Sequence, residues 1–494
     1  MPLVGLVLAG VLQAGVTFIG WQTDLLQYVG IWLMTGEFSG VIAGRYELLW
    51  IAGAAAALAW FAADQFAILG LGREAATGLG LNHAAVMRLG LLVVSVVTAM
   101  VVVSVGMVPF VGLVVPNIVA RVMGDNLRAS LPVVATGALR WCWPATCWRG
   151  WCAIPTRCRW APSWASSGRS CSCGFCTGRR RVDRRIAAIA LVLLAASAAY
   201  LLWGIGGNWR FVLGLRAGKL AGMLVVGAAI GVATILFQTV SQNRILTPAI
   251  MGFDALYVLL QTALVAALGV TGFALLPTGA KFAAEVTLMA LAAMALFGLL
   301  LGRGAQDIAR MILTGVILGI LFRSLAGFLA RVMDPNAFAV VQDQSFASFS
   351  RVDGALLPWA SGAAVLAVMA AFRLSSRLDV MALGRPVAVS LGLRYEAMTF
   401  AALALVAVLV SVSTALVGPV TFFGLIVAGL AHSLLSSARH ALLLPAASLI
   451  GGAILVIGQL VFERALGLQS ALSVVVEFVG GLFFLWLLLK GRIR

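Results

Sequence analysis

The sequence predicts an all-α polytopic membrane protein, and three observations support this fold class. Of the 494 residues, 62% are apolar and only 10% are charged, whereas soluble domains are about half apolar and a quarter charged. Apolar stretches of about 20 residues, long enough to cross a hydrocarbon core, recur along the chain. Two stretches of sequence also repeat each other 312 residues apart. The composition excludes a water-soluble globule and a disordered chain.

The apolar stretches form two unequal sets on either side of an arginine-rich segment. The first set predicts about five spans, the last two of them weak: 2–20, 47–69, 89–109, 112–123 and 130–139. The second set predicts ten spans: 186–204, 219–240, 247–269, 282–302, 307–328, 355–373, 397–416, 420–436, 441–460 and 474–490.

Basic residues in short loops predict the orientation, because Lys and Arg are retained on the cytoplasmic side. If the ten spans start inside, the arginines of 303–310 and 373–394 and the basic C-terminus are all cytoplasmic. Ten of the 34 basic residues lie between 140 and 185. The net charge of +17 therefore reflects this segment and the loop bias, and we expect membrane lipid and no nucleic acid as a partner.

The internal repeat predicts the domain organisation. Leu-Gly-Arg-Glu-Ala-Ala-Thr-Gly-Leu-Gly-Leu at 71–81 recurs as Leu-Gly-Arg-Pro-Val-Ala-Val-Ser-Leu-Gly-Leu at 383–393, and 105–115 matches 417–427 at the same offset. Because Met1 then corresponds to residue 313, the first copy is truncated. We predict three parts: a truncated copy over 1–139, a linker over 140–184, and a complete copy over 185–494.

Glycines punctuate both copies of the repeated loop. Gly72, Gly78 and Gly80 in the first copy, with Gly384 and Gly392 in the second, can supply the positive φ that breaks a helix into short pieces. An ordinary turn with basic flanks is the alternative, and the repetition makes it less attractive. Such a loop of short helices suits docking to a soluble partner.

The motif L-G-R-x5-L-G-L followed by G-x-V-x-F-x-G-L-x-V resembles the FecCD-type permeases of iron-siderophore and vitamin B12 ABC importers. Gln238, Asn243, Pro248 and Gly252 resemble that family's Q-x4-N-x4-P-x3-G run. The segments 248–257 and 344–349 look like one partner of a catecholate-siderophore permease pair, and 110–117 and 123–126 look like the other. The resemblance implies a ten-helix permease over 185–494 that follows the C-terminal half of a second permease.

By position, the resemblance assigns two sets of site residues. The loops that receive the ATPase correspond to 383–398 and 71–88, with the candidates Leu383, Gly384, Arg385, Gly392, Glu396, Leu71, Gly72, Arg73 and Gly80. The basic residues that pair with a binding protein correspond to Arg216, Lys219 and Arg464. Lysine stands at 219 where arginine is usual, and it cannot form the same bidentate pair.

The function implied is import of a ferric siderophore, of the catecholate type, by alternating access in a bacterial inner membrane. Expected partners are a cytoplasmic ABC ATPase dimer, a periplasmic or lipid-anchored siderophore-binding protein, and a second permease or the fused copy. No cofactor is expected and the chain is not an enzyme, because Gly218-Lys219 is followed by leucine and lacks the Walker Ser/Thr. The alternatives are an ion-coupled secondary transporter and a nonfunctional fused product.

All seven cysteines lie between 142 and 176. A zinc site would need four ligands in paired spacing, and no histidine lies within this segment, so no metal site is expected. Leucine codons read one base late give cysteine and tryptophan, and a last span belongs here by the repeat. We therefore hypothesise that about 141–180 is an out-of-frame translation and a poorly ordered linker.

Overall fold

The structure is a computed structural model that describes residues 47–70, 72–105, 177–203, 209–244, 246–302, 308–345, 354–435 and 437–465, with short pieces within 12–23, 115–135 and 347–352. Helices are the only regular elements in these ranges. Contacts divide the chain into two compact units, residues 27–172 and residues 173–494 together with 1–26.

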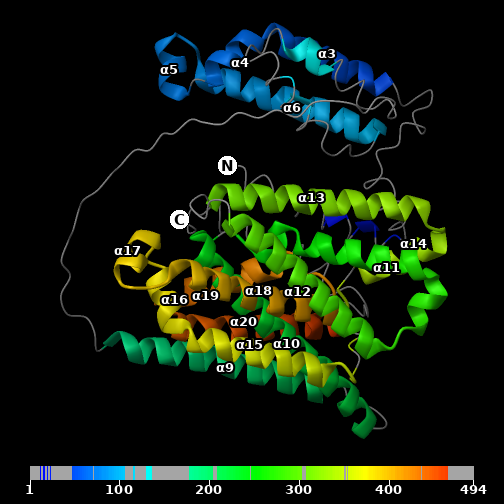
Figure 1. The fold of residues 1–494 in the computed structure, drawn as a ribbon, viewed down its shortest axis with the longest axis vertical. Coiled ribbons are helices and arrows are strands. Elements are labelled where there is room, and N and C mark those ends of the chain that lie inside the picture. Colours follow the sequence, from blue (N-terminus) through cyan, green and yellow to red (C-terminus); the bar gives the residue numbers. More distant parts are fainter. Residues whose placement is uncertain are drawn as a thin grey trace. The chain divides into compact units, whose positions relative to one another are not determined.

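The smaller unit contains α3 (Glu47–Phe61), α4 (Ala63–Gly70), α5 (Arg73–Gly78) and α6 (His83–Val105). Helices α3 and α4 meet at an angle of 61°. Both pack against α6, and α5 lies in the connection between α4 and α6 (Figure 1).

The larger unit contains a longer series of helices. In order they are α9 (Thr177–Leu202), α10 (Trp209–Ser241), the 3₁₀ turn η1 (Pro248–Met251), α11 (Phe253–Leu275), α12 (Thr278–Gly302), α13 (Ile308–Val332), α14 (Pro335–Gln344), α15 (Leu357–Arg373), α16 (Ser375–Met381), α17 (Arg385–Ser390), α18 (Tyr395–Val417), α19 (Phe423–Leu434) and α20 (His440–Ala465).

Helix α10 is the centre of the larger unit. It packs against α9, α15, α18, α19 and α20 (Figure 1), and the second half of the helix is almost wholly buried. Lipid tails are as apolar as leucine, so close packing of small residues has to hold such a helix to its neighbours. The sequence provides Gly222, Gly227 and Gly231 along α10.

The crossing of α10 and α20 depends on glycine. A Cβ placed on Gly227 would lie 2.6 Å from the carbonyl carbon of Gly451, and one on Gly231 would lie 2.8 Å from the carbonyl oxygen of Ala447. Both pairs follow the small-xxx-small spacing of membrane helices. The two backbones therefore touch, and no larger residue fits between them.

The helices confirm most of the predicted spans. Among the described residues, eight helices are long and apolar enough to cross a membrane, and the bent pairs α3–α4 and α15–α16 raise the number to ten. The predicted spans 2–20, 112–123 and 474–490 lie wholly or mostly outside the described residues, as does the cysteine-rich segment, and the span 130–139 is described only over 130–135. Helix α9 begins at Thr177, inside the predicted linker.

Helices α19, α10 and α14 also differ from the prediction. Helix α19 has only 12 residues, because Gly418 with φ 105° ends α18 and the following Pro419 delays the next helix. Helix α10 begins at Trp209 instead of 219. The short helix α14, which packs against α11, was not predicted, since its ten residues are too few for a span.

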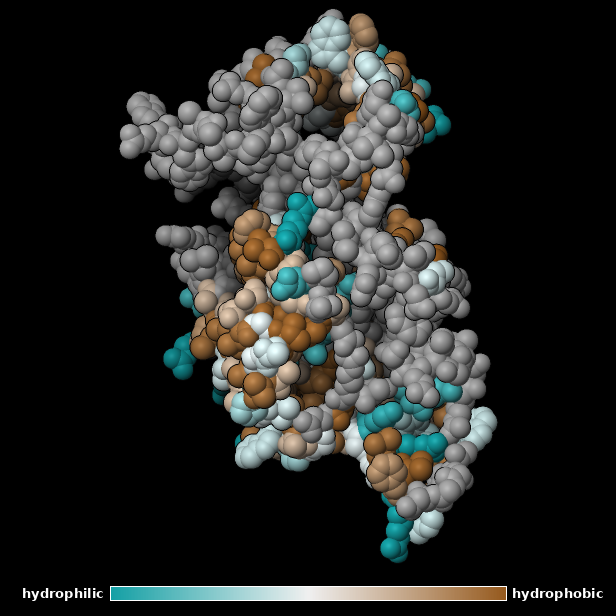
Figure 2. All heavy atoms as spheres, turned by 90° about the vertical axis from the view of Figure 1, so that its right-hand side faces the viewer, coloured by the Kyte–Doolittle hydropathy of each residue, from teal (hydrophilic) through white to brown (hydrophobic). Residues whose placement is uncertain are grey.

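Large apolar side chains are exposed on the outer helices, as expected for a surface that faces lipid. Leu291, Leu366 and Phe328 are each about two-thirds exposed. On the face shown in Figure 2, apolar side chains reach the surface beside polar ones. The large share of apolar residues, which excludes a soluble protein, thus lies on the outer surface as well as in the core.

Candidate functional site

The loop between α16 and α18 folds around two glycines. Gly384 (φ 92°) precedes α17, and Gly392 (φ 82°) follows it. The amide of Gly384 donates to the carbonyl of Met381 at 3.1 Å, and the amide of Leu393 donates to that of Ala388 at 3.0 Å. The side chain of Ala388 is fully buried, which anchors α17 to the end of the bundle.

The first copy has the same local structure at the same offset. Helix α5 corresponds residue for residue to α17, and α6 to α18. Gly72 (φ 100°) and Gly80 (φ 79°) match Gly384 and Gly392, and the amide of Leu81 donates to the carbonyl of Ala76 at 3.0 Å. The preceding helices bend by 61° in the first copy and 59° in the second. The repeated sequence therefore gives a repeated shape.

The glycine prediction is confirmed at four of its five positions. Gly78 is the exception, because it ends α5 without a positive φ. Leu71 lies outside the described residues, and for Arg73 the structure describes only the backbone at the start of α5.

Arg385 and Glu396 form an ion pair of 3.1 Å that ties α17 to the first turn of α18. Their side chains are 37% and 73% exposed, so the pair adds at most about 1 kcal/mol of stability. In the first copy Ala84 stands at the position of Glu396, and this pair cannot form. The two loops thus share a backbone shape but place their charged residues at different positions.

The second loop presents apolar side chains to the exterior. Leu383 is 59% exposed and Leu391 is 61% exposed, with Val387 and Val389 between them also exposed. In the first copy Leu79, at the position of Leu391, is 65% exposed, whereas Ala75 and Thr77 replace the two valines. A small apolar patch beside charged residues is typical of a protein-docking surface.

Arg216 lies at the opposite end of α10 from this loop. Its Nη1 donates to the carbonyls of Trp203 at 2.9 Å, Leu201 at 3.2 Å and Tyr200 at 3.4 Å. The guanidinium therefore stabilises the C-terminal end of α9, where a positive charge is favourable.

The structure brings the three predicted receptor-docking residues to one end of the bundle. Lys219 lies about one turn after Arg216 on α10, and Arg464 belongs to the last turn of α20, although its side chain is not described. Helices α10 and α20 run antiparallel. Tyr200 connects the start of α10 to the end of α20, because its carbonyl accepts from Arg216 and its hydroxyl donates to Glu463 at 3.4 Å.

Two acids in the predicted spans are buried. Glu285 accepts a hydrogen bond from Gln261 at 2.7 Å and lies 3.9 Å from the Lys281 ammonium, so this acid is paired with neighbouring polar groups. Asp254 is buried in the first turn of α11. Within the described ranges, no group of three or more His, Cys, Asp or Glu side chains could hold a metal ion.

Sequence reasoning missed Asp379. This residue contacts His440, and the two lie 61 residues apart. No spacing pattern connects them.

The helices, the close glycine packing and the exposed apolar surface together define a multi-pass membrane protein. The chain belongs to the FecCD transport family, whose profile matches residues 1–151 and 185–490. It is a permease subunit of a bacterial ABC importer and not itself the ATPase. This confirms the predicted class and excludes the ion-coupled alternative.

Curated relatives match the chain over different lengths. The petrobactin import system permease protein YclO of Bacillus subtilis (strain 168) is 37% identical over 310 residues, which is 63% of this chain and 98% of YclO. The corresponding protein YclN of the same organism is 44% identical over 140 residues, 28% of this chain and 44% of YclN. The ferric-anguibactin transport system permease protein FatD of Vibrio anguillarum is 40% identical over 137 residues, 28% of this chain and 43% of FatD.

A solved structure has the same fold. It is described as an inward-facing conformation of a metal-chelate type ABC transporter, and it matches with a TM-score of 0.56 at 21% identity. The match covers 63% of this chain and 99% of that one.

Proposed function

We propose that this chain forms the translocation path of an ATP-driven importer for a ferric siderophore of the catecholate type, in a bacterial inner membrane. Membership in the FecCD family is the observation that carries the proposal. Relatives named for petrobactin and anguibactin import support the substrate class. The resemblance of 248–257 and 344–349 to one partner of a catecholate permease pair supports the subclass.

The domain organisation is part of the proposal. Residues 1–139 are the C-terminal part of one permease, 140–184 are a linker, and 185–494 are a complete ten-helix permease. The helix bounds that repeat at an offset of 312 support this division. So does the family match, which is interrupted between 151 and 185. Two permease proteins of one bacterial system match over 98% and 44% of their lengths, as a complete and a truncated copy would.

The two ends of the bundle have different partners. An ABC ATPase dimer docks on 383–398 and on 71–88 from the cytoplasm, because these loops are exposed and apolar and have one shape. A siderophore-binding protein docks near Arg216, Lys219 and Arg464 on the other side, where basic residues gather. The second permease of the transporter is either a separate subunit or the fused first copy.

Uptake of iron tests the function directly. A strain that lacks its own siderophore permeases and expresses this chain with its ATPase and binding protein should accumulate ⁵⁵Fe from a ferric catecholate siderophore, and deletion of the ATPase should abolish uptake. Uptake that persists without the ATPase and stops when the proton gradient is dissipated would restore the ion-coupled alternative. No uptake, with the chain present in the membrane, would favour a nonfunctional fusion.

Substitution of Arg216 and Lys219 separates a structural role from a docking role. Arg216→Gln should lower both stability and binding-protein affinity, because it frees the C-terminal carbonyls of α9 as well as removing a charge. Lys219→Gln should weaken binding-protein affinity by about two- to fivefold and leave the thermal midpoint unchanged. Affinity measured at two salt concentrations checks this. An unchanged affinity in Lys219→Gln would remove Lys219 from the interface.

A further inference from the structure

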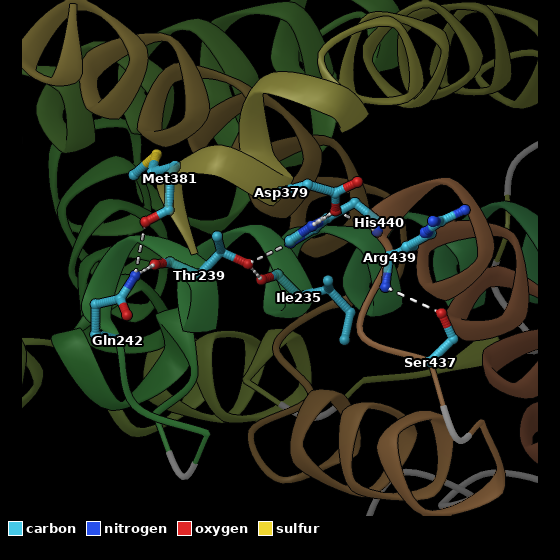
Figure 3. Close-up of polar contacts among 8 residues, drawn as sticks. All are labelled: Ile235, Thr239, Gln242, Asp379, Met381, Ser437, Arg439 and His440. Atoms are coloured by element: carbon cyan, nitrogen blue, oxygen red, sulfur yellow. Dashed lines mark hydrogen bonds and ion pairs between the residues drawn. The ribbon is translucent and has the colours of Figure 1, made fainter. Parts of the chain in front are cut away.

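Three helices of the larger unit are joined by one chain of polar side chains (Figure 3). Asp379 of α16 accepts from the backbone amide of His440 at 2.7 Å, and the same carboxylate oxygen lies 2.7 Å from the Nδ1 of that ring. The Nε2 of His440 lies 2.7 Å from the hydroxyl of Thr239 on α10. His440 is 97% buried, with a side-chain exposure of 3%. Asp379 thus caps the first residue of α20, where a carboxylate is favourable.

A second contact holds the same short helix to α10. Gln242 follows the last turn of α10, and its Nε2 donates to the carbonyl of Met381 at 3.1 Å. The side chains of Leu378 and Met381 are fully buried beneath these contacts. Helix α16 is therefore fastened to the start of α20 at Asp379 and to the end of α10 at Met381, directly before the loop that contains α17.

The two helices on the far side of this junction are packed closely against each other. Helices α10 and α20 are in backbone contact at Gly227 and Gly451, so they form one close-packed pair. Helix α17 is joined to α16 through one tight turn at Gly384. The polar side chains then connect α16 to the start of α20 and to the end of α10. Packed elements with discrete contacts are the physical means by which such coupling travels.

The first copy lacks the residues for this junction. At the offset of 312, Ala67 stands in the place of Asp379 and Arg128 in the place of His440. The two loops have one backbone shape, but only the second is connected to a central helix by these side chains.

We propose that Asp379, His440 and Thr239 are positioning residues of a transmission joint. Through this joint the displacement of the 383–398 loop by the ATPase reaches the central helix α10, and the joint exists in only one of the two copies. The proposal rests on the proposed function, because it requires an ATPase on that loop. None of the three side chains touches the transported substrate in this role.

Transport per ATP hydrolysed tests the joint, because a residue with a merely structural role would not change this ratio. The complex of full chain, ATPase and binding protein is reconstituted in proteoliposomes. Asp379→Asn should lower the ratio at least about tenfold, since it weakens a charged hydrogen bond to a buried ring. ATPase affinity should change less than about twofold, because Asp379 lies outside the docking loop. Asp379→Glu should recover part of the ratio.

Two further variants keep the test decisive. Asp334→Asn makes the same chemical change at an exposed residue before α14 and should leave the ratio unaltered. Thr239→Val removes only the far hydroxyl, is close to isosteric, and should lower the ratio about three- to tenfold even if Asp379→Asn fails to fold. The double variant Asp379→Asn with His440→Gln should be no worse than the poorer single variant.

The outcomes are distinguishable. If both Asp379→Asn and Thr239→Val keep the wild-type ratio of transport to ATP hydrolysed, the proposed joint is wrong and the proposed import function is unaffected. Equal losses of ATPase affinity and transport would show that the residues only support the docking loop, which also overturns the joint. A wild-type complex that binds no ATPase overturns the proposed function and the joint with it.

Discussion

Gly227→Ala should destabilise the chain, whereas Gly214→Ala on the same helix should stabilise it. Alanine in a helix is more favourable than glycine by about 0.5–1 kcal/mol, and a Cβ on Gly214 meets nothing within 4 Å. At Gly227 the new Cβ would lie 2.6 Å from backbone atoms of α20. Because backbone cannot rotate away as a side chain can, α10 and α20 must separate, at a cost of about 1–3 kcal/mol.

The two substitutions are expected to change stability in opposite directions, so each serves as the control for the other. Thermal unfolding in one detergent, followed by the fraction that elutes as a monodisperse peak, should place the apparent midpoint of Gly227→Ala below wild type and that of Gly214→Ala at or above it. Gly227→Leu should give little folded protein. A midpoint for Gly227→Ala equal to that of Gly214→Ala would mean that α10 and α20 do not make backbone contact.

Leu391→Asp should strongly weaken docking of the ATPase without unfolding the chain. The side chain is 61% exposed, so the change removes no core packing. An aspartate in an apolar docking patch must be desolvated on binding, and loss of a central contact costs about 2 kcal/mol or more, which is about thirtyfold in affinity. We expect transport to fall by at least this factor, with an unchanged thermal midpoint.

Matched variants show whether the two loops are equivalent. Leu79→Asp makes the same change in the first copy, where Leu79 is 65% exposed, and should weaken ATPase binding less because Ala75 and Thr77 make that loop less apolar. Leu391→Met is the conservative control and should behave like wild type. ATPase affinity of Leu391→Asp equal to that of wild type would remove this loop from the interface.

The shape of the two loops could be predicted from the sequence because it depends on residues that are close together in the chain. Glycine at 72, 80, 384 and 392 is required where φ is positive, and the structure places a break at each of these positions. Most spans could also be predicted from the sequence, since a stretch of about 20 apolar residues is typical of a membrane-spanning helix. The short length of α19 was not predicted, because a hydropathy pattern does not show that Gly418 and Pro419 interrupt the helix.

The joint could not be predicted because it depends on tertiary contacts. Asp379 and His440 are 61 residues apart, and Thr239 is 201 residues from His440. Each of them alone looks like an ordinary polar residue at the end of a helix. Likewise, Arg216 was expected only as a docking residue, and its bonds to the end of α9 follow from the packing of α9 beside α10.

The central claim is that two loops 312 residues apart are sibling docking sites for one ATPase on one side of the membrane. A photo-crosslinking residue at position 391 and, in a separate protein, at position 79 tests it directly in inside-out vesicles with the ATPase added. We predict that both positions cross-link to the ATPase and that neither reacts with an impermeant reagent applied from the periplasmic side. Labelling of either position from the periplasmic side, or no ATPase adduct at 391, would contradict the claim.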